Sequence, residues 1–184
     1  MKVDKVRGEV KLSDTYGQYL TFLLGNELYG FEVGNIREVI EYSQITSITQ
    51  VPRVPGYIKG VINLRGDVMP VIDLTYRFFK QYNNITRRTC IVIVEMADDE
   101  EVIHVGAMID AVNSVININT ADIEPPMGFS AKIRPDFIHG IGKVADNFAI
   151  LLNIQTVLDI EEISNFDDFE NSELRIRPIL SSIS

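Results

Sequence analysis

The side chains that most often carry out catalysis are few in this chain and lie far apart. Of its 184 residues, two are histidines, His104 and His139, and one is a cysteine, Cys90. Each lies in a stretch that is predicted to be a strand, and none has a second histidine or cysteine at metal-ligand spacing. We therefore interpret Cys90 as a small buried side chain and both histidines as structural or surface residues.

Motifs of the common enzyme classes are also missing from the sequence. The chain has neither a glycine-rich phosphate loop nor the Gly-x-Ser-x-Gly turn of many hydrolases. Acidic pairs such as Asp98-Asp99 carry little weight among 26 acidic residues, and residues 97–101 lack the glycine and ligand spacing of a calcium loop. The sequence thus predicts a non-catalytic protein without cofactor or metal. A small enzyme with a hidden site remains an alternative.

The charge of the chain limits the partners that it can attract. The formal net charge is −9 at pH 7, and the basic residues are scattered apart from Arg87-Arg88. Nucleic acids and anionic membranes attract basic surfaces, so we expect neither nucleic-acid binding nor direct membrane contact. A polar N-terminal stretch, short apolar runs and a single cysteine predict a cytoplasmic protein. A nucleic-acid-binding small barrel is the competing hypothesis from another class.

Most of the chain alternates β-rich runs with turn residues, which predicts a mainly β fold. Gly25-Asn26 and residues 64–67 have the composition of hairpin turns. Pro70 cannot donate a hydrogen bond to a sheet, so it suggests an edge strand or a bulge. The predicted strands are 16–24, 27–33, 57–63, 68–73, 89–96, 102–108, 112–118, 137–144 and 148–154. Helical turns are predicted at 35–39, 74–79 and, near the C-terminus, 155–163.

Two segments of the chain are echoed later in the same order. Residues 57–74 align with 137–154, and residues 29–40 align with 105–116. Two echoes in one order indicate two copies of a β-unit, and copies of this size fit small barrels.

The copies share glycines but differ at a hairpin turn. Gly60 aligns with Gly140, and both are predicted to be structural because a strand glycine often marks a bulge or a close backbone approach. The first copy has Asn63-Leu-Arg-Gly66 at its turn, whereas the second has Lys143-Val-Ala-Asp146. The first copy therefore has an arginine, Arg65, at a turn position where the second copy has none. The Arg65 guanidinium can make fixed, bidentate contacts with a partner.

Several stretches resemble the CheW-like domain family of bacterial chemotaxis. The most specific is Tyr57-Ile-Lys-Gly-Val-Ile-Asn-Leu-Arg-Gly-Asp-Val-Met-Pro-Val-Ile-Asp-Leu74. The others are 31–40, 48–52, 105–112, 122–125 and 137–143. The resemblance is to a free-standing adaptor, since 184 residues leave no room for the kinase regions of CheA or the receiver domain of CheV. Many members have an arginine directly after the residue matching Leu74, whereas here Thr75-Tyr76 intervene before Arg77.

The resemblance covers residues 16–163 and implies a fold. That fold consists of two five-stranded SH3-like barrels packed together, with short helices and with strands that can exchange between the barrels. Residues 1–15 are predicted to be a flexible N-terminal segment and residues 164–184 a C-terminal tail.

The resemblance also implies a function and two sets of binding residues. The adaptor would bridge the cytosolic tips of chemoreceptors and the histidine kinase CheA, within arrays at the inner face of the membrane. Arg65 matches an arginine associated with receptor binding, and Glu38 matches the glutamate that goes with it. We hypothesise that the two residues pair across the first barrel and, with Asn63 and Gly66, order a groove for a receptor helix. The alternative is that Arg65 only fixes its own hairpin.

The residues expected to meet the CheW-like domain of CheA are apolar, because binding hot spots lie in desolvated centres. They are Leu20, Val33, Ile36 and Val112. The alternative is that these four residues belong to the ordinary core. Strand alternation places Leu20 and Phe22 on one face but does not say which face is buried.

Overall fold

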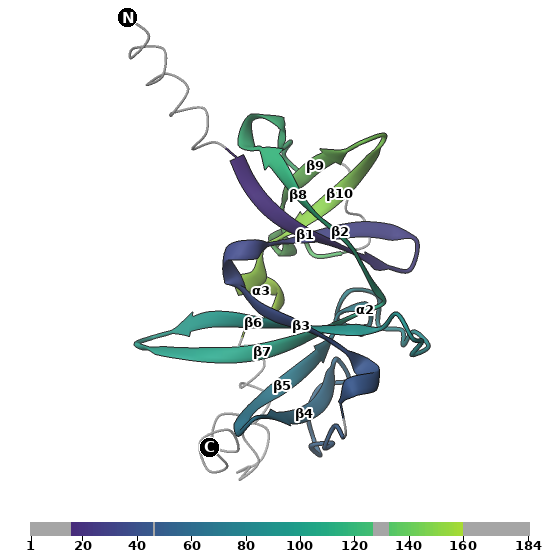
Figure 1. Cartoon of the computed structure of the whole chain (residues 1–184), viewed down its shortest axis with the longest axis vertical. Coiled ribbons are helices and arrows are strands. Elements are labelled where there is room, and N and C mark those ends of the chain that lie inside the picture. The colour runs from purple at the N-terminus through teal and green to yellow at the C-terminus, as the bar shows by residue number, and fades with distance from the viewer. Residues whose placement is uncertain (1–15, 46, 127–132, 160–184) are drawn as a thin grey trace, which may run out of the picture.

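The computed structural model describes residues 16–45, 47–126 and 133–159 (Figure 1). The segments predicted at 1–15 and 164–184, and the end of the helix predicted at 155–163, lie outside the described residues. The elements are β1 (Tyr16–Leu24), β2 (Glu27–Glu32), η1 (Val33–Asn35), β3 (Ile36–Glu41), η2 (Tyr42–Gln44), β4 (Ile58–Leu64), β5 (Asp67–Asp73), α2 (Leu74–Phe79), β6 (Cys90–Asp98), β7 (Glu101–Ile109), β8 (Ala111–Asn119), η3 (Thr120–Asp122), η4 (Pro135–Phe137), β9 (Ile138–Val144), β10 (Asn147–Leu152) and α3 (Ile154–Val157).

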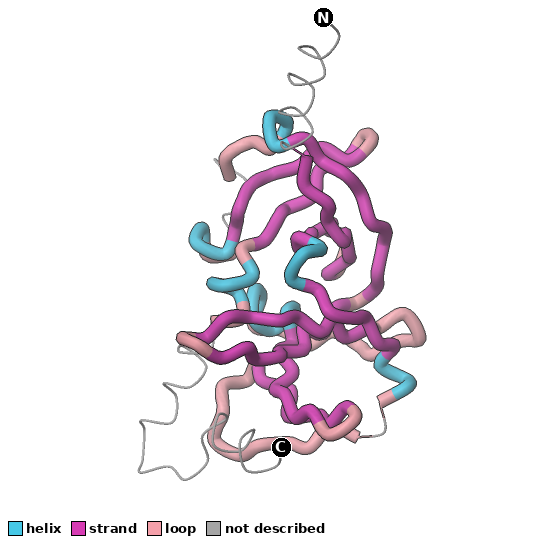
Figure 2. The backbone as a smooth tube through the Cα atoms, turned by 60° about the vertical axis from the view of Figure 1, so that its left-hand side comes forward, coloured by secondary structure: helices cyan, strands magenta, loops and turns pink. Residues whose placement is uncertain are grey.

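The strands form two five-stranded sheets, so the predicted fold class, mainly β with two five-stranded units and short helices, is confirmed (Figures 1 and 2). The upper sheet of Figure 1 has the order β8-β1-β2-β10-β9, and the lower sheet has the order β3-β6-β7-β5-β4. In the same view α2 and α3 lie between the two sheets.

The two sheets exchange strands in a reciprocal way. In the repeat alignment, β2 to β5 of the first copy correspond to β7 to β10 of the second copy. The upper sheet takes β1 and β2 from the first copy and its other three strands from the second, and the lower sheet does the reverse. Each exchanged hairpin joins its host sheet on both sides, through a parallel pair (β2 with β10, or β7 with β5) and an antiparallel pair (β1 with β8, or β6 with β3). Neither copy can therefore complete its sheet alone.

Two local predictions differ from the structure. The helical turn predicted at 35–39 is wrong: the 3-10 turn ends at Asn35, and Ile36 begins β3. The β-branched residues of this segment favour a strand, and β6 is available to pair with it. Pro70 lies in an inner strand, not at an edge, but a register shift between Ile58 and Gly60 of β4 lies next to its pairing with Val61. Pro70 is accommodated because β5 pairs with β7 only from Val71 onward.

One large hydrophobic core is shared by the two sheets. Phe22 and Phe31 of the upper sheet pack in the same cluster as Val92 and Val105 of the lower sheet, together with Phe78 of α2. Each sheet also encloses a smaller cluster of its own. Burying apolar surface on both faces of β1 and β6 accounts for their nearly continuous apolar sequences.

Arg77 ties the two copies together at the centre of the molecule. Its Nε donates a hydrogen bond of 3.1 Å to the carbonyl oxygen of Val157, which joins α2 to α3. Its guanidinium carbon lies 4.4 Å from the ring centre of Tyr57 and 4.9 Å from that of Phe137. These two aromatic residues occupy matching positions of the repeats. Many family members have an arginine directly after the residue matching Leu74, whereas here Thr75 and Tyr76 precede it. In this position Arg77 makes cation–π contacts with an aromatic ring of each copy.

Each copy ends in a short helix with the same kind of N-cap. The side chain of Asp73 accepts a 3.1 Å hydrogen bond from the backbone N–H of Tyr76, and that of Asn153 accepts one of 3.1 Å from Gln155. Asp73 is buried, and its Oδ2 has no hydrogen-bond partner among the described residues. Burial raises the pKa of Asp73 above its usual value, although the Tyr76 N–H opposes this effect.

We expect Asp73→Asn to raise the free energy of unfolding at pH 7. Asparagine keeps the cap acceptor and removes a buried charge. Because folding raises the pKa of Asp73, the native state holds its proton more tightly. Wild-type stability therefore falls as pH rises from the unfolded pKa to the folded pKa, and the variant should lack that fall. Urea unfolding from pH 4 to pH 8 measures both, and parallel pH curves for the two proteins would contradict the interpretation.

Candidate functional site

The turn between β4 and β5 holds the arginine singled out by the repeat comparison. Arg65 has φ of 54° and Gly66 has φ of 87°, so both central residues take the left-handed conformation of a tight hairpin. The Oδ1 atom of Asn63 accepts a 2.9 Å hydrogen bond from the backbone N–H of Gly66. The turn is thus fixed by its own residues. The Arg65 side chain is 67% exposed, so it remains accessible to a partner.

Arg65 forms an ion pair with Glu38 of β3 through its Nη2 atom. In the strand order of the lower sheet, β3 and β4 stand at opposite ends, so this contact requires the sheet to curl on itself. The structure therefore brings together all four residues of the predicted receptor-binding set, which are Glu38, Asn63, Arg65 and Gly66. Their role in binding stays a prediction. Exposed pairs of this kind contribute little to stability, which leaves Arg65 free to exchange partners.

A bulge in β3 adds a second arginine to this surface. The register of β3 against β6 shifts between Ile36 and Glu38, so Arg37 is an extra residue in the strand. Successive side chains of a regular strand point to opposite faces, and a bulge changes that direction. Glu38 accordingly contacts Arg65, while Nη1 of Arg37 lies 3.4 Å from Oδ2 of Asp67, at the other end of the same turn.

A charged cluster continues from Asp67 across the lower sheet. Nδ1 of His104, on β7, lies 2.5 Å from Oδ2 of Asp67, and its Nε2 lies 3.2 Å from Oε2 of Glu95 on β6. Arg37 completes the cluster, with Nη1 3.0 Å from Nε2 of His104. The sequence predicts a structural or surface role for His104 and does not indicate this cluster. Its four members come from four strands, so no spacing in the sequence indicates it.

The four apolar residues of the predicted kinase-binding set do not share one environment. Leu20 is buried in the shared core, so it has little surface to offer. Val33, Ile36 and Val112 are only partly buried and pack against that core from η1, β3 and β8. Any direct contact with a kinase would therefore fall to these three residues. Their binding role stays a prediction.

Gly60 and Gly140 each lie against an extended connector. A Cβ on Gly60 would lie 2.4 Å from the carbonyl oxygen of Thr49, and one on Gly140 would lie 2.4 Å from Cγ2 of Ile123. The connectors make isolated bridges with the strands of these glycines, between Thr49 and Val61 and between Glu124 and Ile141. A side chain on Gly60 would therefore overlap with backbone, whereas one on Gly140 would require the Ile123 side chain to move.

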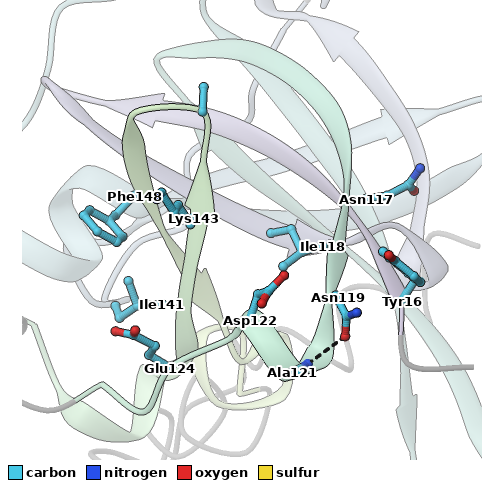
Figure 3. Close-up of a pocket in the computed structure, with 11 residues that line it drawn as sticks. Tyr16, Asn117, Ile118, Asn119, Ala121, Asp122, Glu124, Ile141, Lys143 and Phe148 are labelled. Atoms are coloured by element: carbon cyan, nitrogen blue, oxygen red, sulfur yellow. Dashed lines mark hydrogen bonds between the residues drawn. The ribbon is translucent and has the colours of Figure 1, made fainter. Parts of the chain in front are cut away.

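The second copy has a polar pocket of about 500 Å³ at its own hairpin (Figure 3). Ala145 takes the place of Arg65 there, so the two hairpins present different chemistry. Lys143, Asp122 and Glu124 bring charges of both signs to the lining, and Phe148 adds an exposed ring. No histidine or cysteine lines this pocket. Within the described residues, no group of three His, Cys, Asp or Glu side chains is arranged to hold a metal ion.

The part of the chain that the structure describes contains no helix with the length and apolar character needed to cross a membrane.

Comparisons with known proteins place this geometry among chemotaxis proteins. The CheW-like domain model matches residues 18–162. The chemotaxis protein CheW of Klebsiella aerogenes is 32% identical over 171 residues, covering 92% of this chain and 96% of the relative. CheW of Bacillus subtilis is 32% identical over 142 residues, covering 77% and 86%. The crystal structure of the scaffolding protein TtCheW from Thermoanaerobacter tengcongensis superposes with a TM-score of 0.69 at 34% identity, covering 78% of this chain and 92% of that one.

Proposed function

The chain belongs to the CheW-like domain family, and from that premise we propose that it is a non-catalytic scaffold coupling chemoreceptors to the histidine kinase CheA. The observation that carries this proposal is the domain match over residues 18–162, which spans both copies of the repeat. Its relatives are named as chemotaxis proteins, and the matched crystal structure is that of a scaffolding protein. Such a scaffold would act by holding two partners close together, without chemistry of its own.

On the receptor side, we propose that Arg65 and Glu38 contact the cytosolic tip of a methyl-accepting chemoreceptor. Arg65 is exposed and is held on a fixed turn, so little side-chain and backbone freedom is lost on binding. Its pairing with Glu38 sets the direction of the guanidinium. An acidic or amide side chain on the receptor tip could then accept a hydrogen bond from one of the guanidinium N–H groups.

On the kinase side, we propose that Val33, Ile36 and Val112 meet the CheW-like domain of CheA. They pack against the shared core from η1, β3 and β8, whereas the Arg65 turn joins β4 to β5. A bridging protein must hold both partners together, and these two sets of residues differ in chemistry, one apolar and one charged. Recruitment to receptor arrays at the inner face of the membrane follows from this arrangement.

The proposal is tested by mixing this protein with a tagged receptor-tip fragment and purified CheA. We expect the tag to retain CheA only when this protein is present. Retention of CheA that does not depend on this protein, or failure of this protein to bind either partner, would refute the bridging role.

Val33→Ala is expected to weaken CheA binding about fivefold while leaving receptor-tip binding unchanged. The substitution removes apolar contact area from a partly buried position and introduces no charge. Val39→Ala is the matched control, since Val39 is an exposed valine on β3 outside the predicted set. Titration calorimetry with the CheW-like domain of CheA gives both affinities. Equal losses for the two variants would remove Val33 from the proposed surface.

A further inference from the structure

His104 is placed so that each of its ring nitrogens lies near both a hydrogen-bond acceptor and a donor. Nδ1 lies 2.5 Å from Oδ2 of Asp67, an acceptor, and 3.2 Å from Nη1 of Arg37, a donor. Nε2 lies 3.2 Å from Oε2 of Glu95, an acceptor, and 3.0 Å from Nη1 of Arg37, a donor. A ring nitrogen can accept from Arg37 or donate to Glu95, but it cannot do both.

The charge on the imidazole decides between these two partners. When His104 is neutral, one ring nitrogen has a lone pair and can accept a hydrogen bond from Arg37, which lies within 3.2 Å of both nitrogens. When His104 is protonated, both nitrogens donate, to Asp67 and to Glu95, and the imidazolium repels the guanidinium of Arg37. Histidine is the side chain that commonly changes charge between pH 5 and pH 8. The charged groups that face it are Asp67 on β5, Glu95 on β6 and Arg37 on β3.

Arg37 lies where a partner of the Arg65 turn would meet it. The β3 bulge directs Arg37 and Glu38 toward opposite ends of one hairpin turn, at Asp67 and Arg65. The Arg37 side chain is 44% exposed, whereas that of His104 is only 15% exposed. Arg37 can therefore reach a partner, while His104 acts from beneath it.

We propose that Arg37 is a second partner-binding arginine beside Arg65, and that His104 controls its availability through its charge. The partner is an acidic side chain on the docked receptor segment, so this inference rests on the proposed function. At low pH, charged His104 donates hydrogen bonds to Asp67 and Glu95, so Arg37 is no longer held by His104 and can bind the partner. At high pH, neutral His104 holds Arg37 against the sheet. His104 is thus a positioning residue and Arg37 a binding residue.

The test measures affinity for a purified receptor-tip fragment from pH 6 to pH 8. For the wild type we expect binding to be about threefold tighter at pH 6, the size of effect that one exposed ion pair gives. Arg37→Gln should bind more weakly than wild type at pH 6 and equally at pH 8. His104→Gln, whose amide stays neutral, should show a flat profile. His139→Gln is the matched control, because His139 is exposed on β9 of the other copy, and it should keep the wild-type profile.

A profile in His104→Gln that equals the wild-type profile would overturn the proposal, as would full affinity of Arg37→Gln at pH 6. A second measurement does not depend on the receptor. The NMR signal of the Arg37 guanidinium should shift with pH in the wild type and stay constant in His104→Gln. If no variant binds the tip, the proposed function fails, whereas an Arg37 signal that ignores pH overturns the switch itself.

Discussion

Arg65→Ala is expected to weaken receptor-tip binding by about tenfold or more, with little change in melting temperature. The side chain is mostly exposed, and its pairing with Glu38 is of a kind that contributes little to stability. Alanine also suits the backbone of this turn. Ala145, at the matching position of the second copy, already has φ of 54°, the same value as Arg65. The substitution therefore removes a guanidinium without disturbing the fold.

Isothermal titration with the tip fragment, together with thermal melting, separates binding from folding. Lys143→Ala is the matched control, because it removes an exposed cation from the corresponding hairpin of the second copy. We expect this control to bind the tip as the wild type does. A lower melting temperature for Arg65→Ala with unchanged tip affinity would show that Arg65 serves only its own hairpin.

Gly60→Ala should lower the free energy of unfolding by about 3 kcal/mol, the largest stability effect that we predict. A Cβ at this position would lie 2.4 Å from a backbone oxygen, that of Thr49, which cannot move without disturbing the connector. The φ of Gly60 is also 151°, a value that other residues rarely adopt. Steric overlap and backbone strain therefore add at one position.

Two other glycines separate these contributions. Gly66 has φ of 87°, and a Cβ there would meet nothing within 4 Å, so Gly66→Ala should cost only the backbone strain, about 1 kcal/mol. A Cβ on Gly140 would meet mainly the side chain of Ile123, which can shift, so Gly140→Ala should cost less than Gly60→Ala. Urea unfolding of the three variants gives the order. An equal loss at Gly60 and Gly66 would mean that the connector does not constrain Gly60.

The sequence predicted the strands well because their signals are local. Alternating apolar residues and turn pairs such as Gly25-Asn26 lie within a few residues of one another. The repeat also predicted two similar units. The exchange of hairpins between sheets depends instead on which strands pair, and no local pattern carries that information. The helical turn predicted at 35–39 is wrong because its β-branched residues favour a strand and because β6, which pairs with it, lies more than 50 residues away along the chain.

The candidate site was predictable only where the two copies differ. Arg65 is distinctive because the hairpin turn of the first copy, Asn63-Leu-Arg-Gly66, differs from Lys143-Val-Ala-Asp146 of the second, and the resemblance adds Glu38. The cluster around His104 gave no such signal, because Arg37, Asp67, Glu95 and His104 come from four strands and meet only after the lower sheet has formed. The burial of Leu20 was also undetermined, since both faces of β1 are covered.

The most direct test of receptor-to-kinase coupling is the autophosphorylation rate of CheA on receptor-containing membranes, measured with and without this protein. We predict that the rate rises well above that of CheA with membranes alone when this protein is added, and that Arg65→Ala reduces the increase. A rate that stays the same when folded wild-type protein is added at concentrations that saturate its binding would contradict the proposed coupling.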